Sequence, residues 1–265
     1  MLITSRQNPK VKRVVELHRR RKRNEHRQMV IEGALELSFA LDSGLRFLQF
    51  FYCPAFFAPE TSPDLLPRIE AASDEVYETD PAVFEKLSYR ESPDGWLAVL
   101  PTPERTLAEL TTPPDAFFFV SETVEKPGNI GAMLRTLDAV GGTALLMCDP
   151  TTDITNPNLI RASRGACFTV PVVETTSTAA IAWLKQHNIS ILATTPAATL
   201  TYTAVDLTGP VAVVLGPEDV GLSDLWLHAA THQVVIPMRG RVNSLNVSIA
   251  AALLAYEALR QRTTR

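Results

Sequence analysis

The sequence predicts an α/β protein with two domains, the second built on a mostly parallel sheet with helices on both faces. In the second half, short apolar runs rich in β-branched residues alternate with helical stretches, which is the pattern of a covered parallel sheet. The first hundred residues also alternate helices and strands, and a proline-rich stretch at 101–115 separates the halves. With 265 residues, 46% of them hydrophobic, the chain can bury one or two cores.

The first domain is predicted from short segments with clear boundaries. Ser43-Gly44 closes a helix, Pro54 stops an aromatic strand, and Asp80 with Pro81 opens another helix. The predicted helices span 8–23, 32–41, 65–72 and 81–87, and the predicted strands span 47–52, 75–78 and 96–100. Residues 1–100 therefore form a small α/β domain, and the linker at 101–115 flanks a short helix.

The second domain is predicted over residues 116–265. Its predicted strands span 117–121, 143–148, 190–194 and 211–215, and its predicted helices span 130–140, 158–166, 179–187, 222–230 and 245–260. Ligands of such sheets bind beyond the carboxyl ends of the strands. The loops of interest are therefore 122–131, 194–199, 216–221 and 237–246.

Charge is distributed unevenly along the chain. The net charge is −4, yet residues 1–27 hold ten basic and two acidic side chains, whereas the rest holds 15 basic and 27 acidic ones. A basic arm on an acidic body is typical of proteins that bind nucleic acid, although a solvated or disordered tail has the same composition. We therefore expect RNA contacts from the arm at 1–27.

Several classes of site are disfavoured by composition. Three cysteines without CxxC spacing, Cys53, Cys148 and Cys167, argue against a disulfide framework or a zinc ribbon and fit a reducing cytosol. The N-terminus lacks the apolar run of a signal peptide, and no stretch is long and apolar enough for a membrane span. His228 and His232 lack the glutamate of a HExxH motif. We expect a cytoplasmic protein without a membrane or metal partner.

Two motifs follow predicted strands. In NIGAMLRT, at 129–136, Asn129 can cap a helix whose apolar stretch contains Arg135, either as a functional cation or as a snorkelling side chain. In LGPEDVGL, at 215–222, a single glycine at the strand end followed by Pro217 does not make the GxGxxG of a dinucleotide site. Glu218 either compensates a helix dipole or is a site carboxylate.

Two further segments carry polar groups among apolar residues. In IPMRGRVNSLNVSIA, at 236–250, Ser244, Asn246 and Ser248 either cap the last helix or hydrogen-bond a small ligand. In the segment 156–172, Arg161 and Arg164 are three residues apart and are predicted on one helix face, where they either bind phosphate or form a solvated surface.

The motifs at 129–136, 215–222 and 236–250, in this order and spacing, resemble the three motifs of the SpoU/TrmH family of RNA ribose 2′-O-methyltransferases. The resemblance covers about residues 116–262, the segment 156–172 resembles a further family block, and the start of the chain resembles a substrate-binding extension. It implies the SPOUT fold, whose C-terminal chain forms a trefoil knot, in residues 116–265. It also implies a ribosomal-protein-like RNA-binding domain at 1–100 and a homodimer with the site near the subunit interface.

The resemblance also implies the cofactor, S-adenosylmethionine, and the site residues. The predicted catalytic residues are Asn129, Arg135, Glu218, Ser244 and Asn246. The predicted cofactor-binding residues are Thr194, Leu215, Gly216, Glu218, Gly221, Ile236, Met238, Ser244, Leu245 and Asn246. The predicted RNA contacts are Lys10, Lys12, Arg13, Arg19, Arg20, Arg21, Arg23, Arg135, Arg161 and Arg164. Pro217 departs from the polar residue common in the family.

The implied activity is methyl transfer to a ribose 2′-hydroxyl of structured RNA, with large-subunit ribosomal RNA favoured over tRNA. A non-catalytic RNA-binding protein of the same fold is disfavoured by the intact polar residues, and a nucleotide-dependent dehydrogenase by the missing glycine motif. An arginine base is costly because its pKa exceeds ~12. We therefore expect Arg135 to bind the neighbouring phosphate and stabilise the developing alkoxide.

Overall fold

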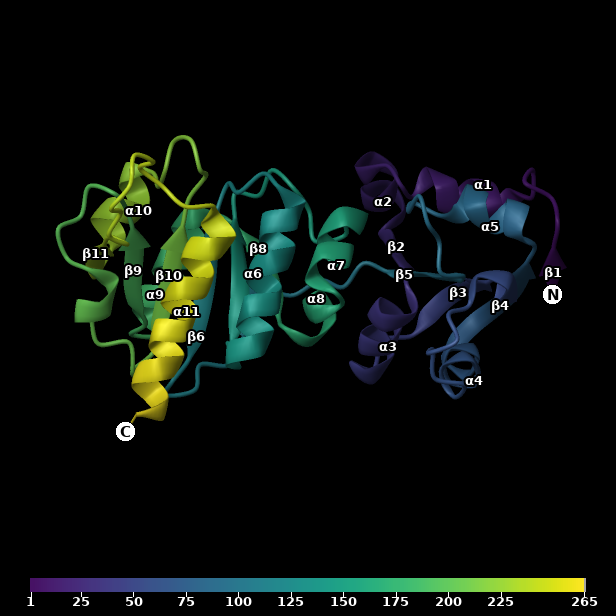
Figure 1. The fold of residues 1–265 in the computed structure, drawn as a ribbon, viewed down its shortest axis with the longest axis horizontal. Coiled ribbons are helices and arrows are strands. Elements are labelled where there is room, and N and C mark those ends of the chain that lie inside the picture. The colour runs from purple at the N-terminus through teal and green to yellow at the C-terminus, as the bar shows by residue number, and fades with distance from the viewer. Residues whose placement is uncertain (265) are drawn as a thin grey trace. The chain divides into compact units, whose positions relative to one another are not determined.

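The computed structural model describes residues 1–264, which form two compact units (Figure 1). Unit 1 consists of residues 1–103 together with Asp153–Thr169, and unit 2 contains the remainder. The polypeptide therefore passes between the units three times, whereas the predicted linker at 101–115 accounts for one passage. The prediction that residues 1–100 and 116–265 serve as RNA-binding and methyltransferase domains stays a prediction. No helix in residues 1–264 is long and apolar enough to span a membrane.

Unit 1 contains a five-stranded mixed sheet in the order β1-β4-β3-β5-β2. β5 runs antiparallel to β2 and β3, and the pairs β3–β4 and β1–β4 are parallel. The strands are β1 (Leu2–Ile3), β2 (Gln28–Glu32), β3 (Phe47–Tyr52), β4 (Ser73–Thr79) and β5 (Trp96–Pro101). The helices from the first part of the chain are α1 (Pro9–Glu16), α2 (Arg20–His26), α3 (Ala34–Asp42), α4 (Leu65–Ala71) and α5 (Pro81–Leu87). The prediction of an Asp80 cap is confirmed, since its Oδ1 accepts the Val83 amide at 2.8 Å.

The basic N-terminal segment is folded, not a disordered tail. Val11, Val14 and Leu17 are fully buried in the core of unit 1. The single helix predicted over 8–23 is wrong, because the chain breaks between α1 and α2. At this break the Arg23 guanidinium donates to the carbonyls of Leu17 and His18 at 3.2 and 2.9 Å, which satisfies acceptors left free at the end of α1.

Arg23 is buried, with 2% of its surface exposed, and holds Asp153–Thr169 on unit 1. Its Nη2 lies 3.1 Å from both carboxylate oxygens of Asp153, and its Nε donates to Thr155 at 2.8 Å. One nitrogen therefore faces both carboxylate oxygens, and all five N–H donors of the guanidinium are used inside unit 1. Arg23 was predicted as an RNA contact, and that prediction is wrong because its donors are used inside the protein.

The helix predicted over 158–166 is also two helices, α7 (Pro157–Ser163) and α8 (Ala166–Thr169). Arg164 adopts the left-handed conformation with φ of 52° and ends α7, so it does not share a helix face with Arg161. Gly165 follows with φ of 88°, and a Cβ there would lie 2.6 Å from the Phe39 ring. The break therefore lets α8 pack closely on α3.

Unit 2 contains a six-stranded, fully parallel sheet in the order β11-β9-β10-β6-β7-β8. The strands are β6 (Phe117–Glu122), β7 (Ala144–Cys148), β8 (Val172–Thr175), β9 (Ser190–Thr194), β10 (Val211–Leu215) and β11 (His232–Val234). The four apolar runs predicted as strands are the four central strands. The outermost strands β8 and β11 were not predicted, since they are short and partly polar.

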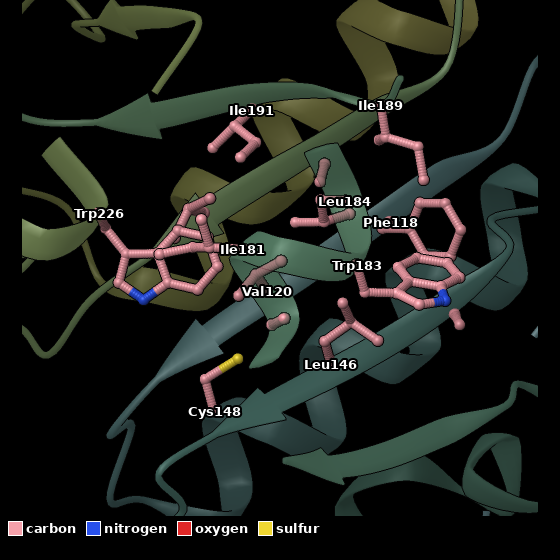
Figure 2. Close-up of a cluster of buried hydrophobic side chains, with 14 of the residues drawn as sticks. Phe118, Val120, Leu146, Cys148, Ile181, Trp183, Leu184, Ile189, Ile191 and Trp226 are labelled. Carbon is pink, nitrogen blue, oxygen red and sulfur yellow. The ribbon is translucent and has the colours of Figure 1, made fainter. Parts of the chain in front are cut away.

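Helices cover both faces of this sheet, as predicted. α9 (Ser177–Gln186) and α10 (Asp224–Ala229) cover one face, where Trp183 and Trp226 pack with Phe118, Val120 and Leu146 (Figure 2). α6 (Pro127–Val140) and α11 (Val247–Thr263) lie side by side over the other face (Figure 1). Three short 3-10 helices, at 54–56, 107–109 and 202–204, complete the fold, and the second supplies the helix predicted in the linker.

The neighbouring strands β6 and β10 mark the point where the order of the sheet reverses. β7 and β8 follow on one side of β6, whereas β9 and β11 lie beyond β10. The crevice outside the carboxyl ends of such strands is the usual ligand site of an open parallel sheet. Gly216, directly after β10, makes a close turn there, because a Cβ would lie 2.6 Å from the carbonyl carbon of Gly221.

Replacing Arg23 with methionine tests its role in unit 1. The change leaves a buried carboxylate without its main partner, so we expect the free energy of unfolding to fall by about 3 kcal/mol. Hydrogen exchange of the β2 and β5 amides in urea measures it. The matched control is Arg46→Met, which removes an exposed ion pair with Asp74 and should change stability by less than about 1 kcal/mol. Equal stability of the Arg23→Met protein and the wild type would contradict this assignment.

Candidate active site

Three segments of unit 2 bring polar side chains together at this crevice. Lys126 and Asn129 lie at the start of α6, directly after β6. Glu218 lies in the loop after β10, and Asn246 lies at the start of α11. The parallel alignment of β6 and β10 places the first two segments at the same edge, and the packing of α11 on α6 adds the third.

The Glu218 carboxylate is the centre of a hydrogen-bond network. Its Oε1 accepts from the Asn129 side-chain amide at 3.0 Å and from the Asn246 amide at 2.8 Å. Its Oε2 accepts from Lys126 Nζ at 3.1 Å. Asn246 Nδ2 also lies 3.1 Å from Asn129 Oδ1. Asn129, Glu218 and Asn246, predicted as catalytic residues from three separate motifs, therefore meet at one place.

The network holds Glu218 ionised. The hydrogen bond from Lys126, followed by that from Asn129, lowers the pKa of Glu218 below its ordinary value. Lys126 also adds a favourable charge interaction, and the Val247 backbone amide another hydrogen bond. Glu218 is partly exposed, with 33% of its side chain accessible, so the carboxylate remains in reach of a ligand.

Three interpretations left open by the sequence are resolved at this site. Asn246 caps α11, since its Oδ1 accepts the Ser248 amide at 3.0 Å, and its side-chain amide reaches Glu218 in addition. The oxygen of the Asn246 side chain therefore caps the helix, while its nitrogen donates to the Glu218 network. Asn129 does not cap α6, because the helix begins at Pro127 and Lys126 is the N-cap residue. Glu218 precedes α10 by six residues and is too far along the chain to compensate its dipole.

Lys126 is the site residue that the sequence did not single out. It lies three residues before Asn129, and 71% of its side chain is exposed. The only signal was a basic residue directly before the proline that opens α6. Such a position is uninformative until the loop after β10 is known to bring a carboxylate to it.

Arg135 and Ser244 lie outside the network. Both are exposed, and neither side chain makes a hydrogen bond or ion pair within residues 1–264. Arg135 is six residues beyond Asn129 on α6, which places it about 240° around the axis and about 9 Å along it. The catalytic roles predicted for these two residues stay predictions.

Several of the predicted cofactor-binding residues lie at the carboxyl ends of the strands. Leu215 ends β10, Gly216 and Gly221 shape the loop after it, and Thr194 ends β9, where its hydroxyl donates to the Val214 carbonyl at 2.9 Å. Ile236, Met238 and Leu245 lie in the extended segment before α11. Backbone amides and carbonyls of residues 236–245 make no hydrogen bond to another described residue. This set of free backbone donors and acceptors fits an adenosine group.

The predicted RNA contacts divide into paired and free cations. Lys10 binds Glu75, Arg13 lies 3.4 Å from Gln28, and Arg20 lies 3.2 Å from Asp153. The exposed cations without such a partner are Lys12, Arg19, Arg135 and Arg164. Arg21 is exposed and interacts with the charge of Glu25, and Arg161 is exposed beside Asn158. Within residues 1–264, no three His, Cys, Asp or Glu side chains cluster as metal ligands would.

Comparison with known proteins assigns the chain to a family. Residues 116–256, which contain the whole polar network, match the SpoU rRNA Methylase family. The chain belongs to this family. The SpoU/TrmH resemblance predicted from the three motifs is thereby confirmed. Residues 8–98 match the MRM3-like substrate binding domain, and they lie within unit 1.

Relatives match over the full length of this SpoU-family chain. A solved RNA 2′-O ribose methyltransferase is 42% identical, with a TM-score of 0.86 over 99% of this chain and 100% of the other. An AdoMet-bound rRNA methyltransferase from Sinorhizobium meliloti is 26% identical, with a TM-score of 0.90 over 98% and 97%. The 23S rRNA (guanosine(2553)-2′-O)-methyltransferase RlmP of Bacillus subtilis is 28% identical over 96% of this chain and 97% of its own.

A tRNA-modifying relative matches less of the chain. The TrmH/SpoU tRNA modifying enzyme of A. aeolicus is 28% identical, with a TM-score of 0.51, over 58% of this chain and 79% of its own.

We predict that Lys126→Met raises the pKa of Glu218. The wild-type pKa is lowered, so the carboxylate contributes to stability above its ordinary pKa of about 4.3, and this contribution disappears as the pH falls through the lowered value. Without the ammonium group, protonation should occur at a higher pH. Carbon-13 NMR of the Glu218 carboxyl measures the shift, and Lys126→Arg, which keeps the charge, is the control. An unchanged pKa in the methionine variant would show that Lys126 does not act on Glu218.

Proposed function

We propose that this protein transfers a methyl group from S-adenosylmethionine to a ribose 2′-hydroxyl of large-subunit ribosomal RNA. It is an RNA 2′-O-ribose methyltransferase, in keeping with the SpoU family and with relatives named for this activity. The observation that supports the choice of RNA is the naming of relatives that match the whole chain. The 23S rRNA methyltransferase RlmP and the rRNA methyltransferase of Sinorhizobium meliloti both match 96% or more of it, including the substrate-binding domain.

The residues of the crevice suit the binding of the cofactor. The backbone of residues 236–245, the turn at Gly216 and the end of β9 would hold its adenosine part. When bound, S-adenosylmethionine supplies a methyl group that is reactive because it sits on a positive sulfur. The protein must then align the ribose oxygen with that methyl group.

The polar network supplies this alignment. The Glu218 carboxylate fixes the amides of Asn129 and Asn246, so these groups have one orientation before RNA binds. Preorganised donors cost no reorganisation when charge develops during the reaction. Arg135 is exposed on the same helix, and its guanidinium donors suit contact with a phosphate and stabilisation of the ribose oxyanion. A non-catalytic RNA-binding protein would have no use for this arrangement.

Mapping ribose methylation in ribosomal RNA tests the function. RNA from cells with and without the protein should differ at one ribose in the large-subunit RNA, and the purified protein with S-adenosylmethionine should restore that methyl group. A difference confined to tRNA would select the alternative substrate. Identical methylation of both RNAs, together with no transfer in vitro, would refute the proposed activity.

Arg135 should require its forked guanidinium. We expect both Arg135→Ala and Arg135→Lys to reduce methyl transfer by ~100-fold or more, because a lysine cannot reproduce bidentate donors in the transition state. The affinity for S-adenosylmethionine, measured by calorimetry, should change little. Thermal unfolding serves as the folding control. A folded Arg135→Ala protein with near-normal turnover would remove this residue from the mechanism.

We also propose that the protein is a homodimer. The support is an exposed apolar stripe on α11, where Ile249, Leu253 and Tyr256 are 52%, 38% and 54% exposed and line a groove with Tyr202. Their spacing puts them on one side of the helix. An apolar helix face of this kind commonly marks a protein interface.

Leu253→Glu should therefore yield a monomer. A carboxylate in the middle of a buried apolar interface is costly to desolvate. Light scattering should give twice 29.1 kDa for the wild type and 29.1 kDa for the variant. Leu35→Glu is the matched control, because Leu35 is also 38% exposed and lies on α3 of unit 1. A wild-type protein that is monomeric at working concentration would contradict the dimer.

The C-terminal trefoil knot and the location of the protein are proposals of the same kind. The chain leaves β11, at one edge of the sheet, and passes through residues 236–246 to α11, which packs on α6 and β10 near the centre. A C-terminal knot requires the chain to come back from the edge of the sheet to its centre in this way. We propose a cytoplasmic location, because an enzyme acting on ribosomal RNA works where ribosomes are made.

A further inference from the structure

Three segments that are distant in sequence meet on the surface of unit 1 around one aromatic ring. Tyr89 is 42% exposed. Its ring contacts His18 edge to face, with centroids 5.3 Å apart, and its hydroxyl lies 3.2 Å from the Asn158 side-chain amide. The junction of α1 and α2, the loop after α5 and the start of α7 are thereby joined.

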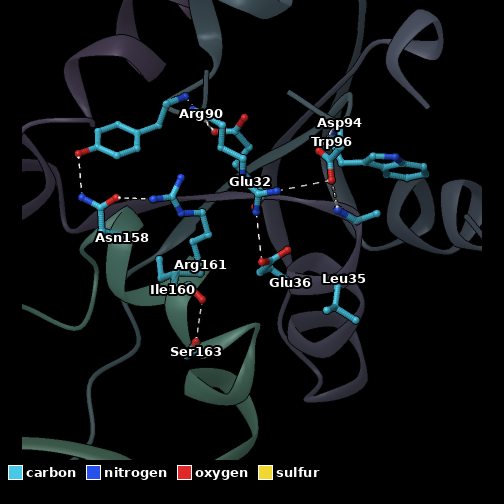
Figure 3. Close-up of polar contacts among 12 residues, drawn as sticks. Glu32, Leu35, Glu36, Arg90, Asp94, Trp96, Asn158, Ile160, Arg161 and Ser163 are labelled. Carbon is cyan, nitrogen blue, oxygen red and sulfur yellow. Dashed lines mark hydrogen bonds and ion pairs between the residues drawn. The ribbon is translucent and has the colours of Figure 1, made fainter. Parts of the chain in front are cut away.

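The loop that carries Tyr89 is fixed from below. The buried Glu32 carboxylate accepts the backbone amides of Tyr89 and Arg90 at 2.9 and 3.3 Å and the Ser88 hydroxyl at 2.5 Å. Arg90 turns inward, 3.2 Å from Glu36, beside β2 and α3 (Figure 3). The charge of Arg90 is therefore compensated inside unit 1. The exposed ring of Tyr89 stands on a rigid support.

The surroundings of the ring are basic. Residues 17–23 hold five basic and no acidic side chains. Of these Arg19, Arg20 and Arg21 are exposed, and Arg20 is paired with Asp153. Arg161 projects from α7 with its Nη2 3.4 Å from Asn158 Oδ1 (Figure 3), and it lines one small pocket together with Tyr89. The Arg23–Asp153 pair brings these two basic segments, 130 residues apart in sequence, onto one unit.

We propose that Tyr89 and Arg161 form an RNA subsite on unit 1, in which Tyr89 stacks on an unpaired base and Arg161 contacts the adjoining phosphate. This inference rests on the proposed function and specifies how its RNA is held outside the crevice. Aromatic rings beside cations are the usual platform for single-stranded bases, because every base has a face to stack. The contact with His18 and the bond of the Tyr89 backbone amide to Glu32 hold the ring in place before RNA arrives.

Four variants separate stacking from charge. Tyr89→Ala should weaken binding to a 23S rRNA transcript about tenfold, because one stacking contact is lost. Tyr89→Phe keeps the ring and loses the hydroxyl, so it should bind like the wild type. Arg161→Ala should weaken binding and lower the slope of log affinity against log salt by about 0.7–0.9, as expected for one phosphate contact. Arg46→Ala, an exposed arginine elsewhere on unit 1, is the matched control.

Filter binding at several salt concentrations measures affinity, and methyl transfer to the same transcript provides an independent readout. The subsite predicts a raised KM for RNA, an unchanged kcat at saturating RNA and an unchanged affinity for S-adenosylmethionine. Wild-type affinity in both Tyr89→Ala and Arg161→Ala would overturn the subsite. A Tyr89→Phe protein as weak as Tyr89→Ala would overturn stacking in favour of a structural role for the hydroxyl. Tight RNA binding without methyl transfer in the wild type would refute the proposed function and leave the subsite standing.

Discussion

The parallel pairing of β6 with β10 is the constraint on which the site depends. Their register aligns Phe117 with Val211 and Ser121 with Leu215, so both strands end together and their following loops open on one crevice. Gly216 permits the loop after β10 to fold back without a side chain in the way. Glu218 then meets Asn129, and α11, packed on α6, delivers Asn246 to the same carboxylate.

The strands that the sequence predicted are those in which nearly every side chain is apolar and buried. The strands at 47–52, 117–121, 190–194 and 211–215 are apolar runs in the middle of a sheet, and composition alone marks them. β2, β8 and β11 were missed because each is short or adjoins a polar segment, and its partner is far away in sequence. The break between α1 and α2 was missed because it depends on Arg23 finding Asp153, which no local pattern reveals.

The site residues likewise divide into those that a local sequence pattern marks and those that depend on a partner far away in the sequence. Three motifs identified Asn129, Glu218 and Asn246, and each motif also had a purely structural explanation. The structure shows that the two explanations are compatible, since Asn246 caps α11 with its oxygen and reaches Glu218 with its nitrogen. Lys126 was missed because its meaning depends on a carboxylate 92 residues away. Arg23, by contrast, was misassigned because a run of basic residues conceals which of them points inward.

The placement of Asp153–Thr169 on unit 1 has a consequence for the order of events during synthesis. Arg23 leaves the ribosome 130 residues before its partner, which at about 5–20 residues per second is a delay of roughly 6–26 s. Until then a cation destined for the interior has no counter-charge, and the residues of β6 and β7 are already emerging. Unit 1 therefore cannot form the Arg23–Asp153 ion pair as a contiguous N-terminal piece, and this part of its interior is completed only after β7 has been synthesised.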